Sequence, residues 1–195
     1  MPLAELQTAL ARLVSAHAAS GSLAPETLDE LALSAEERAW LDSLPGAPGF
    51  RVTCDIQRWW RETRLRETAR LTLVALGPQR AADLVQAFLN AAPCSTLFFL
   101  PEARAFLRFA AETLEDANLS AIARFEHALL VAGDAALQLA PDAPDFDEAT
   151  EIVVFAAPPE ELLDAVLHRH PLPAPSLEGF PVLISPRLPR LWQPI

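Results

Sequence analysis

The spacing of apolar residues changes near residue 140, and this change limits the possible folds more than any other feature of the sequence. Before it, apolar residues recur every three or four positions, which predicts amphipathic helices with short connections. After it, residues 151–155 (EIVVF) and 180–185 (FPVLIS) have the β-branched and aromatic density of strands. The sequence therefore predicts an α+β fold, with an N-terminal multi-helix bundle over residues 1–140 and a small C-terminal α/β lobe over residues 141–195 that contains a short antiparallel sheet.

Ser, Gly and Pro residues predict where several helices begin and end. Ser34 and Glu37 have the spacing of a capping box, which opens a short helix. Residues 45–49 (PGAPG) predict a loop. The longest helical pattern runs from about residue 55 to residue 76 and ends at Gly77-Pro78. Further helices are predicted over residues 3–20, 25–32, 79–91, 101–114, 119–132 and 159–169.

Composition excludes several classes of protein. The net charge is −11, and all 15 basic residues are arginine, so the chain lacks the basic field of a general nucleic-acid binder. The longest apolar runs are far shorter than the ~18–20 residues of a membrane helix. No signal-peptide pattern is present, and a cytoplasmic location is expected. The two cysteines form no CxxC pair, which argues against a disulfide framework.

No motif for a self-sufficient catalytic site occurs in the sequence. The patterns GxSxG, GxGxxG and GxxxxGK[ST] are absent. His168 and His170 could chelate a metal ion, but a stable site needs three or four ligands, so solvated histidines at a helix end are favoured. Cys94 precedes a predicted helix and lacks a neighbouring His, which favours a packed thiol. We expect no catalytic residue, no metal site and no cofactor in this chain.

Arginine and tryptophan alternate on the predicted helix over residues 55–76. Such a mixture can bind nucleic acid through phosphate contacts and stacking, so a DNA-associated regulator is the alternative function. At 100° per residue, however, the arginines spread around the helix, and Glu62 can pair with several of them. A solvated, paired face with the tryptophans anchored in the core is favoured. The residues concerned are Arg58, Trp59, Trp60, Arg61, Arg64, Arg66 and Arg70.

The C-terminal lobe offers two candidate binding surfaces. Two strands alone make a marginal sheet, and a free strand edge can bind an extended peptide by strand addition. The final segment (PRLPRLWQPI) carries arginine and tryptophan, which are enriched at protein interfaces, although it could instead fold back over the bundle as a lid. The predicted peptide-binding residues are Ile152, Val153, Val154 and Phe155, or Val182, Leu183 and Ile184. The predicted partner-interface residues are Arg187, Arg190, Leu191 and Trp192.

Several segments from about residue 55 onward resemble one family. Residues 121–135 (AIARFEHALLVAGDA) are similar to the "LARFE-x-A…A-D" segment of accessory proteins that accompany TIM-barrel iron enzymes in peptide natural-product clusters. Residues 180–192 (FPVLISPRLPRLW) resemble the ending of one branch, the MbnC-type proteins of methanobactin biosynthesis. Residues 58–77 (RWWRETRLRETARLTLVALG) and 94–107 (CSTLFFLPEARAFL) follow in the order of that branch.

The resemblance implies a specific role. MbnC-type proteins form a heterodimer with an MbnB-like TIM-barrel enzyme, and the iron cofactor lies in that partner. Together they convert cysteines of a ribosomal precursor peptide into oxazolone–thioamide groups, which make a copper chelator. The resemblance thus implies that this chain is the non-catalytic subunit and holds the leader of a Cys-containing precursor peptide. An acidic chain would suit a leader rich in lysine.

Overall fold

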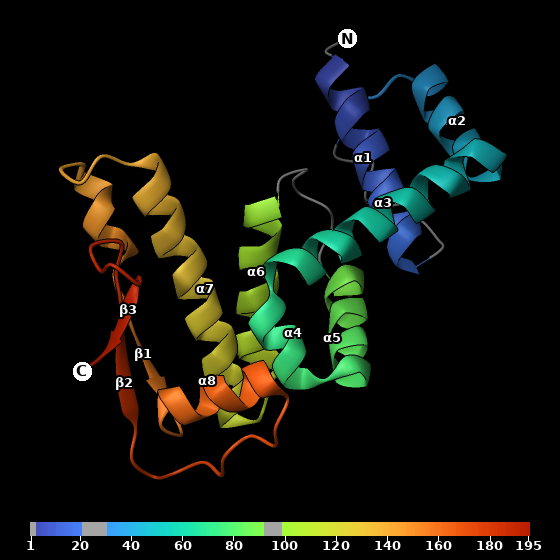
Figure 1. Ribbon diagram of the computed structural model, residues 1–195. Coiled ribbons are helices and arrows are strands. Elements are labelled where there is room, and N and C mark those ends of the chain that lie inside the picture. The colour runs from blue at the N-terminus through green and yellow to red at the C-terminus, as the bar shows by residue number, and fades with distance from the viewer. Residues whose placement is uncertain (1–2, 21–30, 92–98) are drawn as a thin grey trace. The chain divides into compact units, whose positions relative to one another are not determined.

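The computed structural model describes residues 3–20, 31–91 and 99–195. These are mainly helical and carry a small antiparallel sheet near the C-terminus, which confirms the predicted α+β fold (Figure 1). The helix predicted over residues 25–32 and Cys94 both lie outside the described residues. None of the described helices is both long and apolar enough to cross a membrane.

The chain divides into two compact units. The N-terminal unit comprises Met1–Arg64 with Val85–Leu97, and the C-terminal unit comprises Leu65–Leu84 with Phe98–Ile195. The unit that holds the sheet is therefore larger than the predicted lobe over residues 141–195. The physical reason is that the sheet has an apolar inner face, and a helix before residue 140 covers it.

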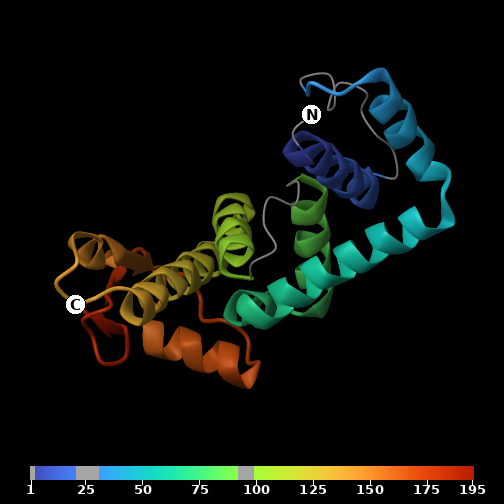
Figure 2. The same ribbon diagram turned by 90° about the horizontal axis from the view of Figure 1, so that it is seen from above.

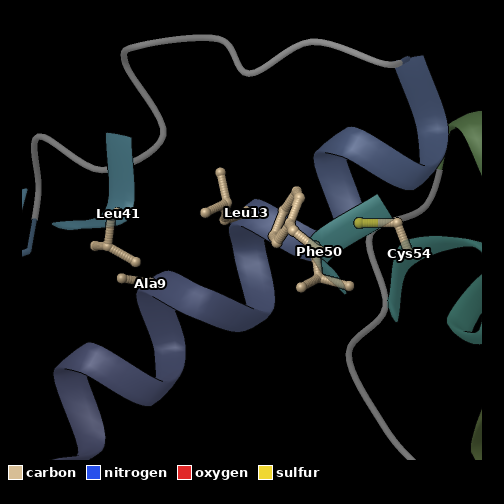
Figure 3. Packing of buried hydrophobic residues seen from close by; sticks show 6 residues of the cluster. Ala9, Leu13, Leu41, Phe50 and Cys54 are labelled. Carbon is tan, nitrogen blue, oxygen red and sulfur yellow. The ribbon is translucent and has the colours of Figure 1, made fainter. Parts of the chain in front are cut away.

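Three helices build the core of the N-terminal unit. They are α1 (Leu3–Ser20), α2 (Ala35–Ser43) and α3 (Pro48–Thr68), with the short 3-10 helix η2 (Leu44–Gly46) before α3. Ala9 and Leu13 of α1 lie near Leu41 of α2 and Phe50 and Cys54 of α3 (Figure 3). All five are buried, and burial raises the pKa of the Cys54 thiol. This apolar cluster is the contact that holds the three helices together.

The predicted capping box at Ser34 is confirmed. The backbone N–H of Glu37 donates to the Ser34 hydroxyl at 3.3 Å, and the Ser34 N–H donates to the Glu37 carboxylate at 2.8 Å. The Ser34 hydroxyl also donates to the Glu37 carboxylate at 2.7 Å, and this bond, together with the one from the Ser34 N–H, holds the pKa of Glu37 below its ordinary value. The predicted loop over residues 45–49 is wrong in part, because η2 occupies its start and α3 already begins at Pro48, a residue suited to the first helical turn.

The single helix predicted over residues 55–76 is two helices. Here α3 ends at Thr68 and α4 (Arg70–Leu76) begins after Ala69, whose φ of −109° and ψ of 45° leave the helical region. The Glu126 carboxylate accepts the N–H groups of Leu71 and Thr72, each at 2.8 Å. A buried side chain from a distant helix thus satisfies the first amides of α4. The predicted stop at Gly77 is confirmed, since Gly77 has a φ of 74° and α5 (Pro78–Ala91) follows.

In the C-terminal unit, α6 (Phe99–Thr113) and α7 (Ala117–Gln138) lie side by side (Figures 1 and 2). Asp116 caps α7 by accepting the N–H of Leu119 at 3.0 Å. Large side chains from both helices are fully buried, among them Phe106, Ile122 and Phe125. After α7 come the 3-10 helix η3 (Pro144–Ala149), β1 (Glu151–Phe155), α8 (Pro159–His168), β2 (Phe180–Ile184) and β3 (Trp192–Pro194).

The sheet has three antiparallel strands in the order β1-β2-β3. Its inner face packs on α7, where the rings of Phe125 and Phe155 meet edge to face with centroids 5.3 Å apart. The sequence predicted only two strands, because the proline-rich end of the chain lacks the composition of a strand. Residues 192–194 nevertheless pair with residues 182–184. A short edge strand tolerates proline, since only one of its sides must donate hydrogen bonds.

Candidate functional site

The side of β1 that faces away from β2, here called the β1 edge, is the best candidate for a binding site. Among the described residues, no strand pairs with it. Between β2 and β3, the N–H of Ser185 donates to the C=O of Leu191, and the N–H of Ile195 donates to the C=O of Pro181. The main-chain N–H and C=O groups of the odd-numbered residues of β2 therefore point toward β3. Along a strand, the main-chain groups of successive residues point to opposite sides, so the N–H and C=O groups of the even-numbered residues of β2 form the hydrogen bonds with β1.

The register of β1 and β2 then identifies the groups on the β1 edge. Val153 lies opposite Val182, and Phe155 lies opposite Phe180, so these residues of β1 form hydrogen bonds with β2. The main-chain N–H and C=O groups of Ile152 and Val154 must therefore point away from β2, into the β1 edge. An extended peptide could form a ladder with these groups.

The side chains of β1 divide between two faces. Val153 and Phe155 are buried against the helices, whereas Ile152 is 55% exposed and Val154 is 56% exposed. Leu183 lies opposite Ile152 and is partly exposed, so an apolar strip lies on the outer face beside the β1 edge. This strip lies where the side chains of an added strand would contact the sheet.

The loop before β2 limits the β1 edge at one end. The N–H of Ser176 donates to the C=O of Ala156 at 2.6 Å, just beyond the last residue of β1. At Gly179 a Cβ atom would lie 2.6 Å from Cγ1 of Val154, so only glycine allows the loop to pass this close to the strand. The accessible part of the β1 edge is thus centred on Ile152 and Val154.

Four of the seven predicted peptide-binding residues lie on a strand with a free edge. The structure places Ile152, Val153, Val154 and Phe155 on β1, at the edge of the sheet. It places Val182, Leu183 and Ile184 on β2, the middle strand, between β1 and β3. The prediction of a free edge at residues 182–184 is therefore wrong, because β3 already takes the hydrogen bonds on that side.

A hollow of about 340 Å³ borders β1 on the helical side of the sheet. Glu151, the first residue of β1, lines it together with residues of α6 and α7, including Arg108, Glu112, Arg124 and His127. Burial, and then the charges of Arg108 and Arg104, lower the pKa of His127, which favours its neutral form. No sequence motif predicts this hollow, because its residues come from three separate elements.

The connector that leads into β1 is acidic. It contains Asp142, Asp145, Asp147 and Glu148, and Glu151 follows, all with exposed side chains. Within the part of the chain that the structure describes, Asp147 is the one member of this group in an ion pair, with the guanidinium of Arg187. This local field would attract a basic peptide and repel an acidic one.

Three of the four predicted partner-interface residues make contacts within the C-terminal unit. Arg187 donates to both carboxylate oxygens of Asp147, at 2.5 and 2.9 Å, and lies 5.1 Å from the ring centroid of Phe146. This contact raises the pKa of Arg187 and lowers the pKa of Asp147. The Trp192 ring meets Phe125 edge to face at 5.5 Å, and Leu191 lies over Gly133 of α7. Arg190 has an exposed side chain.

On α3, the burial of the tryptophans and arginines is the reverse of what the sequence predicted. Trp59 is 58% exposed and Trp60 is 46% exposed, so the prediction that they anchor the core is wrong. Arg61 is only 5% exposed and lies over the ring of Phe88, with 5.9 Å to the centroid. Arg58 donates to Gln86 and Asn90 of α5, and Arg64 is buried. These three guanidinium groups are turned to the protein rather than arranged for phosphate contacts.

The two histidines at the end of α8 lie close to each other and to one carboxylate. The rings of His168 and His170 stack with centroids 5.8 Å apart, and Nδ1 of His168 lies 3.0 Å from the Asp164 carboxylate. Within the described residues, no group of three or more His, Cys, Asp or Glu side chains is placed to hold a metal ion.

Comparisons with known proteins identify no relative. No protein-family model matches the chain, and no curated protein or solved structure matches it significantly.

Proposed function

We propose that this chain is a peptide-binding, accessory subunit that holds a precursor peptide by strand addition at the β1 edge. The single observation that carries this proposal is the edge itself, where the main-chain groups of Ile152 and Val154 point away from β2. Their exposed side chains would give the bound strand apolar contacts on the outer face. Main-chain hydrogen bonds supply affinity in this binding mode, and side-chain contacts supply specificity.

The charge around β1 supports a basic peptide as the ligand. The connector before β1 is acidic, and the whole chain has a net charge of −11. A lysine-rich leader would therefore be drawn to the edge before it forms hydrogen bonds.

The sequence resemblance extends the proposal to a reaction. In that extension, the chain pairs with an MbnB-like TIM-barrel enzyme that carries iron and converts cysteines of the bound peptide into oxazolone–thioamide groups. This chain holds the leader, and Arg190 is the residue of the C-terminal tail best placed to meet the enzyme, since its side chain is exposed. A gene neighbourhood that encodes neither a TIM-barrel enzyme nor a short Cys-containing peptide would contradict this extension.

A binding titration tests the strand-addition step. The peptide is the short Cys-containing precursor that the proposal expects to be encoded beside the gene, and it is labelled with a fluorophore and followed by anisotropy. Ile152→Pro removes an N–H from the β1 edge without removing a bond to β2, and Ile152→Thr is the matched control that keeps the N–H. A lost main-chain hydrogen bond is worth about 1–1.5 kcal/mol, so we expect Ile152→Pro to weaken binding roughly tenfold.

Two outcomes would count against the proposal. One is equal affinity of Ile152→Pro and Ile152→Thr for the peptide, provided that both variants keep the wild-type circular dichroism spectrum. The other applies if Ile152→Pro fails to fold: a peptide N-methylated along its leader would then bind the wild-type chain as tightly as the unmodified peptide.

A further inference from the structure

A second concave site lies between α4 and α8 in the C-terminal unit, away from the residues of the β1 edge. α4 and α8 contact each other (Figure 1), and a pocket of about 570 Å³ opens beside them. Its apolar lining includes Leu73 of α4, Val166 of α8 and Leu172 of the following loop. This volume falls within the range of small-molecule and peptide side-chain sites, roughly 300–1,000 Å³.

The polar lining of this pocket is cationic. Arg66, Arg70, Arg169 and His170 contribute to it, and none of the described lining residues is acidic. The contrast with the rest of the chain is strong, because the chain has 26 acidic residues and only 15 basic ones. Three of those arginines thus surround one apolar hollow, and this distribution favours an anion with an apolar body.

Arg169 lies at a backbone position that favours glycine. It caps the C-terminus of α8 in the left-handed region, with a φ of 57° and a ψ of 35°. Glycine is the usual residue there, because a Cβ atom is strained in this conformation. The pocket's third guanidinium therefore stands on a backbone position that glycine would fill with less strain, which makes a glycine substitution there a clean way to remove it.

We infer that this pocket binds a carboxylate that lies beside an aliphatic side chain in a peptide. Guanidinium groups pair with carboxylates through two parallel hydrogen bonds, and Leu73, Val166 and Leu172 would cover the aliphatic part. A polyanion is disfavoured, because the net charge of −11 repels it, whereas a single carboxylate meets far less repulsion. The carboxylate can belong to an Asp or Glu side chain or to the peptide's C-terminus.

Small capped peptides test this inference on the full-length chain. The probes are acetyl-Leu-Asp-amide, with a side-chain carboxylate, and acetyl-Leu-Leu with a free C-terminal carboxylate. Acetyl-Leu-Asn-amide is the uncharged control, and inorganic phosphate tests a small anion without an apolar part. Binding is followed by NMR through the arginine Nε–Hε signals. We expect at least one carboxylate probe to bind roughly tenfold more tightly than the Asn peptide and than phosphate, which is the effect of a lost charge-assisted hydrogen bond.

Arg169→Gly separates a binding role from a structural one. Glycine suits the left-handed backbone, so this variant should unfold at a higher temperature than the wild type and yet lose at least tenfold in affinity for the carboxylate probe. Arg70→Gln should lose affinity as well, whereas Arg51→Gln, in the N-terminal unit, should bind as the wild type does. Three results would each overturn the inference. The Asn peptide could bind as tightly as the carboxylate probes, phosphate could bind as tightly as these probes, or both Arg70→Gln and Arg169→Gly could keep full affinity. Ile152→Pro should not change these affinities, so this site and the β1 edge are tested independently.

Discussion

Removing the Glu126 carboxylate should destabilise the C-terminal unit strongly. Glu126 is 6% exposed, and it accepts the N–H groups of Leu71 and Thr72 where α4 begins. In Glu126→Ala both amides would lose their partner, and each unsatisfied buried donor costs about 1–3 kcal/mol. For the two amides together we therefore expect a loss of about 2–6 kcal/mol in the free energy of unfolding. Glu126→Gln keeps one acceptor oxygen and should lose about half as much.

The pH dependence of this loss provides a second test. Burial raises the pKa of Glu126 above its ordinary value of 4.5, despite the hydrogen bonds from Thr72 and Leu71 that oppose the shift. The folded chain therefore holds this proton more tightly than the unfolded chain, and the contribution of Glu126 to stability falls as the pH rises from about 4.5 to the folded-state pKa. The difference in stability between wild type and Glu126→Gln should thus be larger at pH 4.5 than at pH 7.

Urea denaturation followed by circular dichroism measures both effects. Glu115→Gln is the matched control, because Glu115 lies just before α7 with an exposed side chain. We expect it to change the free energy of unfolding by less than about 0.5 kcal/mol. A Glu126→Ala variant as stable as this control would refute the explanation of the helix break. If the difference in the free energy of unfolding between wild type and Glu126→Gln grew with pH, the direction of the pKa shift would be refuted.

Four further perturbations have clear expected outcomes. Gly179→Ala should destabilise the chain by about 1–3 kcal/mol in thermal unfolding, because its Cβ would meet Val154. The control is Gly49→Ala in α3, which has open space around it and should be neutral or stabilising. Trp59→Ala should change stability by less than about 1 kcal/mol, and Phe88→Ala, at a buried position, should lose about 3–5 kcal/mol in urea denaturation. Arg187→Ala should speed proteolysis of the C-terminal tail, because the ion pair with Asp147 is lost. In the wild type, the protection of the tail against proteolysis should weaken as the pH falls through the lowered pKa of Asp147. Arg190→Ala should reduce co-purification with the proposed enzyme subunit without a change in melting temperature. Trp192→Ala should lower the melting temperature as well, because its ring packs on Phe125. Unchanged co-purification in Arg190→Ala, or an unchanged melting temperature in Trp192→Ala, would contradict the respective contact.

The features that sequence reasoning predicted are those encoded locally. The capping box of Ser34 and Glu37, the stop at Gly77, and the strands over residues 151–155 and 180–184 each depend on residues within a few positions of one another. For the same reason the α+β class and the β1 residues of the candidate site could be found before the structure was known.

The features that were missed depend on distant partners. The break at Ala69 is stabilised by Glu126, which lies more than fifty positions later and has no sequence signal of its own. The third strand is defined by its pairing with β2 rather than by β-branched residues. That pairing also decides which predicted edge is free, so the choice between β1 and β2 could not be made from composition.

The reversal on α3 has a related cause. Tryptophan is on average a buried residue, and arginine is usually exposed, so the general tendency favoured tryptophans in the core. The stems of arginine can nevertheless pack on apolar surface, and Arg61 does so against Phe88. Which face of the helix is buried was decided by the position of α5, which supplies Gln86, Phe88 and Asn90.

Amide hydrogen exchange at single-residue resolution tests the central claim most directly. In the chain alone, the N–H groups of Ile152 and Val154 should exchange rapidly, whereas those of Val153 and Phe155 should be protected by their bonds to β2. Adding the proposed precursor peptide should slow exchange at Ile152 and Val154 and leave Val153 and Phe155 unchanged. Peptide binding with no added protection at Ile152 and Val154 would contradict strand addition at the β1 edge.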